Sequence, residues 1–292
     1  MNKNIRPRRS ALYMPGSNAR ALEKGRSLPA DVLIMDLEDA VAPSAKVEAR
    51  SLILEALESD GYNHKEIVIR VNGLDTPWGY DDLIMVARSK ADAILLPKVE
   101  SADTIRRVES ILRAVEAPES LAIWCMLETP RGILHAEEIA DASSLLEALV
   151  MGTSDLAMDL HCMHTEMRLP MLNSLSTCVL AARAAGLTVL DGVYLDLNDD
   201  DGYRKSCRAG LEMGFDGKTL IHPKTIKVAN EIFAPSEEEV SWARKIIAAY
   251  HDAVSKGSAV TLVDGKLIEN LHVNGAERTL KLFEVIESRG DN

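Results

Sequence analysis

The segment VLIMDLEDAVAPSAKVEARSLILEAL, residues 32–57, contains the pattern that decides the fold. It starts with an apolar run, VLIMDLE (32–38), of the length of a buried strand. The second part, residues 44–57, places apolar side chains at the spacing of an amphipathic helix. A buried strand followed by a helix is the unit from which parallel sheets are built.

The same unit recurs along the chain. The other apolar runs are 10–14, 67–72, 93–99, 122–128, 148–152, 188–194 and 218–221. The helices expected between and after the runs are 19–27, 79–90, 101–115, 132–140, 171–185, 202–213 and 225–233. Eight such units in one chain predict a closed (β/α)₈ TIM barrel, which typically takes about 250 residues. An open dinucleotide-binding sheet is disfavoured, because no GxGxxG follows the first strand.

The pattern changes after the eighth run. We therefore expect a catalytic barrel over residues 1–234 and a C-terminal arm over residues 235–292, acting as a lid or a swapped arm. The arm begins with a predicted helix in which Ser236 is the N-cap and Glu239 completes a capping box. A hairpin around Asp264-Gly265 and a final helix follow.

Composition narrows the class of protein. Hydrophobic residues make up 47% and charged residues 27% of the 292 residues, as in a soluble globular protein. A net charge of −12 argues against a nucleic-acid partner. Because no apolar run approaches the roughly 20 residues of a membrane span, we expect no membrane partner and a cytoplasmic location. The four cysteines form no CxxC pair and are expected to be structural thiols of a reducing compartment.

Polar residues gather where the apolar runs end. In a barrel of this kind the active site lies at the C-terminal ends of the strands. The residues at these ends are Asp36, Glu38, Asp39, Arg70, Asn72, Lys98, Glu100, Glu128, Thr153, Ser154, Asp155 and His222.

Two of these carboxylates, Glu128 and Asp155, follow consecutive strands. Neighbouring strands lie about 4.8 Å apart, so both carboxylates can reach one cation. Oxygen ligands with positions left for water suit Mg²⁺. The alternative is that each carboxylate caps a helix or pairs with a cationic side chain.

Arg70 ends a run that is otherwise apolar. A buried guanidinium needs an anionic partner. That partner is either a protein carboxylate, Glu38 or Asp39, or a substrate oxygen that the planar guanidinium can bind with two donors.

The segment Pro15-Gly16-Ser17-Asn18 leads from the first run into a helix with Arg20 and Lys24. A helix N-terminus beside basic side chains can bind phosphate. The alternative is that these basic residues are only solvated. The histidines His161, His164, His222 and His272 show no HExxH spacing and are expected to be structural.

Several motifs together resemble a known family. They are SALYMPGSNARALEKG, VLIMDLEDAVAPSAKVEAR, VIRVNG, AILLPKVE, LETPRGI, MGTSDLAMDL and FDGKTLIHP, in this order from about Ser10 to Val285. They resemble the citrate lyase β-subunit-like family, which is grouped with the HpcH/HpaI aldolases and the malyl-CoA and citramalyl-CoA lyases. The resemblance implies a (β/α)₈ barrel in homotrimers or homohexamers.

The resemblance also implies roles for individual residues. Glu128 and Asp155 would hold Mg²⁺, and Arg70 would bind the reacting oxygens. Pro15, Arg20 and Lys24 would contact coenzyme A. Asp36, Glu38 and Asp39 are expected to orient Arg70 or nearby waters, and Glu38 and Asp39 are grouped with the catalytic residues.

The C-terminal arm departs from the family pattern. Members carry a C-terminal segment that covers the active site of a neighbouring subunit, and many read DGKMID-x-PH, with the aspartate as catalytic acid/base. Here the stretch is DGKLIENLH, so Glu269 stands at the aspartate position and Leu271 at the proline position. Glutamate can act as a general base, but with a different reach.

These observations predict an Mg²⁺-dependent carbon–carbon lyase. It would cleave a 3-hydroxyacyl-CoA such as malyl-CoA or citramalyl-CoA into an acyl-CoA and a 2-oxo acid. Three alternatives stay open: a malyl-CoA thioesterase, a pyruvate aldolase without coenzyme A, and a citrate lyase β subunit that acts on a carrier-protein thioester.

Overall fold

The structure is a computed structural model that describes residues 5–59 and 61–290 of the chain. The chain divides into two compact units. One unit spans Arg8–Glu231, and the other contains residues 5–7 and 232–290. The division falls inside helix α10, before the boundary that we expected after residue 234.

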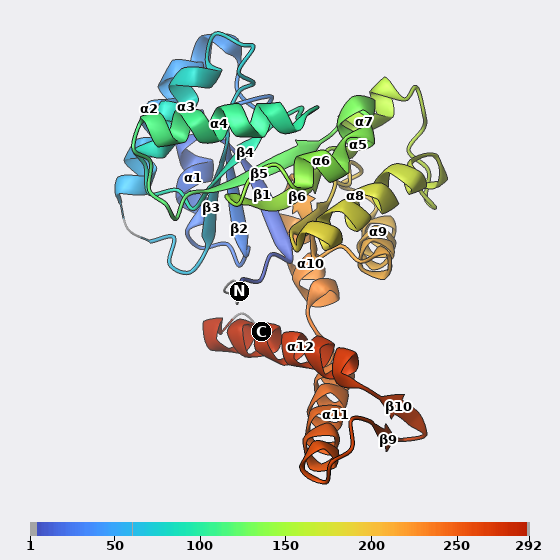
Figure 1. The fold of residues 1–292 in the computed structure, drawn as a ribbon. Coiled ribbons are helices and arrows are strands. Elements are labelled where there is room, and N and C mark those ends of the chain that lie inside the picture. Colours follow the sequence, from blue (N-terminus) through green and yellow to red (C-terminus); the bar gives the residue numbers. More distant parts are fainter. Residues whose placement is uncertain (1–4, 60, 291–292) are drawn as a thin grey trace. The chain divides into compact units, whose positions relative to one another are not determined.

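The first unit is a closed barrel of eight parallel strands in sequential order, with helices around it (Figure 1). The first strand pairs with the second and with the eighth, which closes the ring. The predicted (β/α)₈ barrel is therefore confirmed. The strands are β1 (Ser10–Pro15), β2 (Val32–Asp36), β3 (Glu66–Arg70), β4 (Ala93–Leu96), β5 (Ala122–Leu127), β6 (Leu146–Met151), β7 (Thr188–Asp191) and β8 (Gly217–Leu220).

A network of ion pairs centred on Arg8 stabilises one end of the barrel. Arg8 precedes β1, and its guanidinium donates hydrogen bonds to Glu66 at 2.6 and 2.7 Å and to Glu147 at 2.7 Å. The same guanidinium stacks on the buried ring of Trp124 at 4.8 Å. Since Glu66 and Leu146 begin their strands, this network lies at the N-terminal end and leaves the C-terminal end for chemistry.

The helices of the barrel unit alternate with the strands. Two features differ from the sequence-based expectation: the helix expected at 132–140 is two short helices that meet at His135, and a further helix follows β6. The helices are α1 (Ala19–Gly25), α2 (Lys46–Glu58), α3 (Gly79–Ala87), α4 (Ala102–Ala114), α5 (Pro130–Leu134), α6 (Ala136–Ala140), α7 (Thr153–Asp159), α8 (Leu172–Ala185), α9 (Asp200–Met213) and α10 (Ile226–Phe233). Three 3₁₀ turns span Pro43–Ala45, Leu169–Met171 and Pro223–Thr225.

The second unit has its own small core. Helices α11 (Glu237–Ser255) and α12 (Asn270–Arg289) pack together with the hairpin of β9 (Thr261–Val263) and β10 (Lys266–Ile268). Ser236 and Glu239 form the predicted capping box at the start of α11. The hairpin turn is at Asp264 and Gly265, as expected, and both residues have positive φ, which a two-residue hairpin turn requires.

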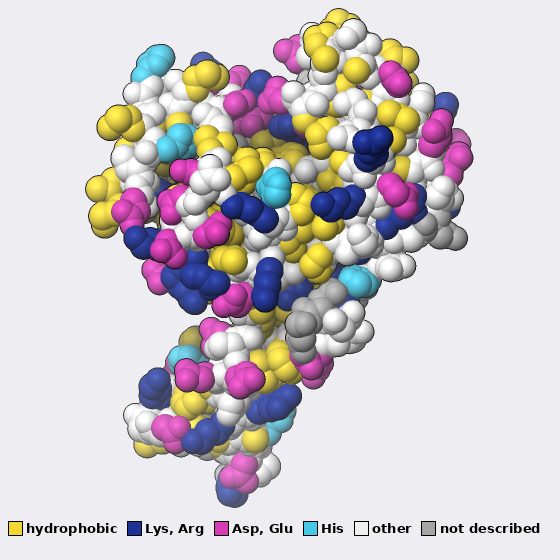
Figure 2. Space-filling model, turned by 180° about the vertical axis from the view of Figure 1, so that it is seen from behind, with side chains coloured by type: hydrophobic (Ala, Val, Ile, Leu, Met, Phe, Trp, Pro, Cys, Tyr) yellow, Lys and Arg dark blue, Asp and Glu magenta, His cyan; other side chains and the backbone are white. Residues whose placement is uncertain are grey.

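In the part of the chain that the structure describes, no helix combines the length and the apolar character that crossing a membrane requires. On the face shown in Figure 2, basic side chains stand among acidic ones.

Candidate active site

Arg70 and Asp36 form the centre of the site at the C-terminal end of the barrel. They end neighbouring strands and are direct register partners of β3 and β2. The Nε and Nη2 atoms of Arg70 donate hydrogen bonds of 2.7 and 2.6 Å to the two oxygens of Asp36. Asp36 also accepts hydrogen bonds from the backbone N–H groups of Glu38 and Ala40. This aspartate therefore fixes both the guanidinium and the loop after β2.

The neighbouring acidic residues, Glu38 and Asp39, differ in their contact with Arg70. Oε2 of Glu38 lies 2.8 Å from Nη1 of Arg70, although among the described residues it has no partner with hydrogen-bond geometry. Asp39 is 3.9 Å from the same nitrogen, and 62% of its side chain is exposed. Burial raises the pKa of Glu38, and the charge of Arg70 opposes this. Glu38 thus belongs to the buried cluster, whereas Asp39 lies at its edge.

Tyr13 packs against the same guanidinium. The Arg70 guanidinium carbon is 4.8 Å from the centre of the Tyr13 ring, and the Tyr13 hydroxyl lies 3.5 Å from the Met126 sulfur. Burial raises the pKa of Tyr13, so the phenol is neutral at physiological pH. An aromatic face and a carboxylate therefore hold Arg70 in one orientation.

Glu128 is the most deeply buried acid of the predicted metal pair, with 3% of its surface exposed. Its Oε1 atom accepts a 2.8 Å hydrogen bond from the backbone N–H of Lys98. Burial, together with the negative charges of Glu38 and Asp155, raises the pKa of Glu128 to about 7, although the hydrogen bond from Lys98 opposes the shift. Gly152 makes room for this side chain, because a Cβ there would collide with Glu128.

Asp155 and Lys98 complete the cluster. Asp155 lies in the first turn of α7, and its Oδ2 atom is 3.6 Å from the Lys98 ammonium. The same ammonium is 3.8 Å from Oε1 of Glu38. The structure thus brings together Arg70, Glu38, Glu128 and Asp155, and it adds Lys98, to which we had given no role.

The charges of this cluster fit a divalent cation. Asp36, Glu38, Glu128 and Asp155 face two cationic side chains, Arg70 and Lys98, so two negative charges are in excess when all four acids are ionised. Carboxylate oxygens are the ligands that Mg²⁺ prefers. Within residues 5–59 and 61–290, no three His, Cys, Asp or Glu side chains converge as a metal cage. The protein would therefore supply few ligands, and water or substrate the rest.

The residues expected to contact coenzyme A lie at the end of β1 and along the short helix α1. Pro15 ends β1 and is partly buried, whereas Arg20 and Lys24 are exposed on the helix. The Asn18 side chain caps α1 by accepting a 3.1 Å hydrogen bond from the backbone N–H of Ala21. The two basic side chains are four residues apart on one face, so a phosphate could bind both.

Glu269 lies in the other unit, as the N-cap residue of α12. Its backbone N–H donates a 3.0 Å hydrogen bond to Nδ1 of His272. The side chain is partly exposed.

Three other strand-end residues have structural contacts. The Asn72 amide donates to the Leu37 carbonyl and to Asp82, and His222 caps the 3₁₀ turn after β8. The backbone carbonyl of Glu100 contacts the His135 ring.

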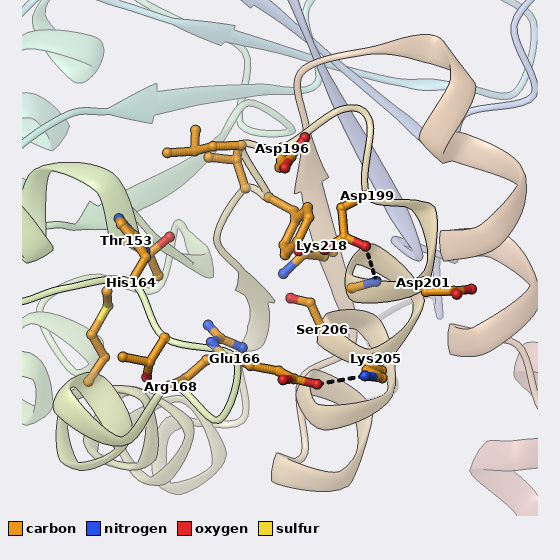
Figure 3. Close-up of a pocket in the computed structure, with 16 residues that line it drawn as sticks. Thr153, His164, Glu166, Arg168, Asp196, Asp199, Asp201, Lys205, Ser206 and Lys218 are labelled. Carbon is orange, nitrogen blue, oxygen red and sulfur yellow. Dashed lines mark hydrogen bonds and ion pairs between the residues drawn. The ribbon is translucent and has the colours of Figure 1, made fainter.

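A separate cavity of about 390 Å³ lies beside this cluster, next to the ends of β7 and β8 (Figure 3). Of the polar residues expected at the strand ends, Thr153 is among the described residues that line it, whereas Arg70, Glu128 and Asp155 are not. Thr153, which starts α7, and Ser206 on α9 contribute hydroxyl groups. The Glu166–Lys205 ion pair of 2.6 Å also lines the cavity.

A buried charge network forms one wall of this cavity. Lys218 donates a 2.6 Å hydrogen bond to Asp191, and Arg168 contacts both oxygens of the same carboxylate at 2.5 and 2.9 Å. The two cations lower the pKa of Asp191 in spite of its burial. Sequence reasoning missed this network. Asp191 lies inside the apolar run 188–194 and Lys218 begins the run 218–221, whereas Arg168 lies in a segment to which no element was assigned.

Comparison with known proteins identifies relatives of the whole chain. The family described as HpcH/HpaI aldolase/citrate lyase matches residues 9–223. A (3S)-malyl-CoA thioesterase of Cereibacter sphaeroides is 47% identical over 99% of each chain. The L-malyl-CoA/β-methylmalyl-CoA lyase of Cereibacter sphaeroides is 34% identical over 97% of this chain and 96% of its own. The citrate lyase subunit beta of Escherichia coli K12 is 35% identical over 97% of this chain and 95% of its own.

Solved structures share the fold. The protein CitE from Mycobacterium tuberculosis, in complex with magnesium, acetoacetate and coenzyme A, is 28% identical and has a TM-score of 0.74. The alignment covers 94% of this chain and 97% of CitE. The citrate lyase β subunit from the same organism, complexed with oxaloacetate and magnesium, has a TM-score of 0.67 and covers 79% of this chain and 97% of its own.

These comparisons correct one expectation. The prediction of a carbon–carbon lyase was wrong, because relatives that are 47–48% identical over nearly the full length are named thioesterases. The relatives named lyases are more distant, at 33–35% identity. The motifs behind the lyase prediction lie within residues 9–223, the part of the chain that the family model matches. They therefore indicate the family and not the reaction.

Proposed function

The chain belongs to the HpcH/HpaI aldolase/citrate lyase family, and we propose that it hydrolyses the thioester of (3S)-malyl-CoA or a closely similar small hydroxyacyl-CoA. The products are malate and free coenzyme A. The observation that carries this proposal is the full-length similarity to proteins named (3S)-malyl-CoA thioesterases. The acidic cluster at the barrel end supports it, because it can bind the charged end of such a substrate through a divalent ion.

Glu128 and Asp155 are the residues that would hold Mg²⁺. The two excess negative charges of the cluster, and the raised pKa of Glu128, support a bound divalent cation. The relatives solved with magnesium give independent support. When bound, Mg²⁺ supplies positive charge that attracts and orients the carboxylate and hydroxyl oxygens of the malyl group.

Arg70 is positioned to stabilise negative charge on a reacting oxygen. Asp36 and Tyr13 hold its guanidinium rigidly, and it is 8% exposed. A preorganised donor of this kind lowers the barrier by a few kcal/mol, because it requires no reorganisation when charge develops. In hydrolysis, water adds to the thioester carbonyl carbon and one proton leaves the water. The C–S bond then breaks, and the coenzyme A sulfur takes up a proton.

A general base must take the proton from the water. We assign this role to Glu269, which stands where related sequences place an acidic residue in the C-terminal arm. Glu38 then supports the site by holding Arg70, whereas the exposed Asp39 lies at the edge of the cluster. We also propose that the protein is a homotrimer or homohexamer in which the arm of one subunit reaches a neighbour's site. Size-exclusion chromatography coupled to light scattering would measure the number of subunits.

The coenzyme A group is assigned to the end of β1 and to α1. Pro15, Arg20 and Lys24 lie on one segment at the C-terminal end of β1, and the two basic residues are exposed. Basic side chains next to a helix N-terminus favour phosphate groups.

Product analysis tests the proposed reaction. The purified protein is incubated with (3S)-malyl-CoA and Mg²⁺, and free thiol, malate and glyoxylate are measured in the same sample. We expect thiol and malate in equal amounts and no glyoxylate. Glyoxylate with acetyl-CoA and no free thiol would refute hydrolysis. EDTA should abolish turnover, and added Mg²⁺ should restore it, whereas full activity in EDTA would refute the metal.

A further inference from the structure

Lys98 has an unusual backbone conformation for its residue type. It follows β4 with a φ of 47°, in the left-handed region that costs a non-glycine residue about 1 kcal/mol or more. In this conformation its backbone N–H donates the 2.8 Å hydrogen bond to Glu128. Since that carboxylate is almost fully buried, the bond compensates part of the strain. The conformation fixes the start of the Lys98 side chain beside the acidic cluster.

The side chain of Lys98 then reaches two further acids. Its ammonium lies 3.6 Å from Asp155 and 3.8 Å from Glu38, so one residue contacts three acids of the cluster. Both distances exceed those of a charged hydrogen bond, which is typically 2.7–2.9 Å. The ammonium is held by charge without directional bonds, and 52% of the side chain is exposed. It can therefore leave the cluster without breaking a hydrogen bond or crossing a packed core.

We propose that the Lys98 ammonium is a place-holder for the divalent ion: it neutralises Glu38 and Asp155 while the ion is absent, and the ion displaces it. This inference rests on the proposed Mg²⁺ site. Without the ammonium, the four ionised acids exceed the charge of Arg70 by three; the ammonium offsets one of these charges and a divalent ion offsets two, so the divalent ion binds the acids more strongly. The exchange keeps the buried acids from facing one another uncompensated in the unloaded protein, which would be costly.

Mg²⁺ affinity tests the place-holder. Isothermal titration calorimetry with Mg²⁺ alone compares the wild type, Lys98→Met and the control Lys90→Met. Met keeps the length of the side chain and removes its charge, and Lys90 is exposed before β4, at the opposite end of that strand. Removal of a positive charge this close to the ligands should tighten Mg²⁺ binding by roughly tenfold or more. The Lys90→Met affinity should equal that of the wild type.

Chemical labelling distinguishes displacement from simple repulsion. The rate of acetylation of each lysine is measured by mass spectrometry with and without saturating Mg²⁺. Displacement exposes the Lys98 amine, so its acetylation should become several-fold faster, while that of Lys90 stays constant. Unchanged or weaker Mg²⁺ binding by Lys98→Met, or unchanged or slower labelling of Lys98, would overturn the place-holder. A wild type that binds no Mg²⁺ would instead overturn the metal site of the proposed function, and the place-holder with it.

Discussion

The guanidinium of Arg70 and the carboxylate of Asp36 are joined by two hydrogen bonds between register partners of adjacent barrel strands. We had expected Asp36, Glu38 and Asp39 to orient this arginine. Asp36 makes two hydrogen bonds to it, whereas Glu38 lies 2.8 Å and Asp39 3.9 Å from its Nη1 atom. The register explains the difference. Asp36 is level with Arg70 across β2 and β3, whereas Glu38 and Asp39 lie beyond the end of β2.

Asp36→Asn should disable the site and weaken the fold. The change leaves a buried guanidinium with less compensating charge, which should cost about 3 kcal/mol of unfolding free energy. The turnover number should fall, because Arg70 loses its fixed orientation. Urea denaturation and steady-state kinetics measure the two effects. Asp39→Asn is the matched control, since Asp39 is exposed and 3.9 Å from Arg70, and it should be close to wild type. Equal effects of the two variants would contradict the assignment.

Glu128→Gln should change how stability depends on pH in the absence of metal. The pKa of Glu128 in the folded protein is about 7, above its ordinary value of 4.5. The folded state therefore binds more protons than the unfolded state between these values. Stability from the protonated carboxyl is full below about pH 4.5 and is lost as the pH rises through about 7. The unfolding free energy of Glu128→Gln should therefore not decrease over this pH range. At pH 8 it should exceed that of the wild type by on the order of 2–3 kcal/mol.

The measurement is thermal or urea unfolding in EDTA from pH 5 to pH 8. Glu100→Gln serves as control, because Glu100 follows the neighbouring strand and is exposed. Parallel profiles for wild type and Glu128→Gln would mean that Glu128 does not titrate in this range. With Mg²⁺ added, only the wild type and the control should gain stability.

Gly152→Ala should remove the metal site without touching a charged residue. The new methyl group would occupy space now filled by the Cβ and Oε2 atoms of Glu128 and would push that side chain aside. Mg²⁺ affinity, measured by calorimetry, should fall by tenfold or more. Gly275→Ala is the control, because nothing lies within 4 Å of its new methyl group. That variant should be neutral or up to about 1 kcal/mol more stable, since alanine favours the helix. Unchanged Mg²⁺ affinity in Gly152→Ala would argue against Glu128 as a ligand.

Arg20→Ala and Lys24→Ala should weaken binding of coenzyme A esters. Each removes an exposed positive charge from α1, so KM should rise about three- to tenfold with little change in kcat, and the rise should shrink at high salt. Arg106→Ala, a similarly exposed change on α4, should leave KM unaltered. A fall in kcat at constant KM would place these residues in the chemistry and not in coenzyme binding.

Glu269→Gln should lower kcat by a hundredfold or more while Mg²⁺ affinity stays constant, because the amide cannot accept a proton from water. Glu277→Gln, on a later turn of α12, is the matched control and should keep wild-type kcat. Wild-type turnover in Glu269→Gln would exclude this residue as the base. Glu269→Asp should recover part of the rate if the reach of the side chain matters.

The barrel could be predicted from the sequence because its signals are local. A strand buried on both faces must be largely apolar, as residues 32–35 of β2 are, and each helix repeats its apolar face every three to four residues. The candidate residues could be predicted for the same reason, since they follow the strands directly. Helix α7 was missed because its first residues were interpreted only as the polar segment that ends β6. The break at His135 was missed because the apolar pattern continues through it.

The sequence by itself thus determined the fold, its strands and the acids at the end of the barrel. It did not determine the reaction, and the reaction proposed above rests on relatives that are similar along the whole chain. The tertiary structure alone decided which of these residues touch. Closing the ring set Asp36 level with Arg70, and the left-handed backbone at Lys98 turned its ammonium toward Glu38 and Asp155. Such contacts depend on strand register and on single backbone angles. Neither produces a local sequence pattern, because the contacting residues are far apart in the chain.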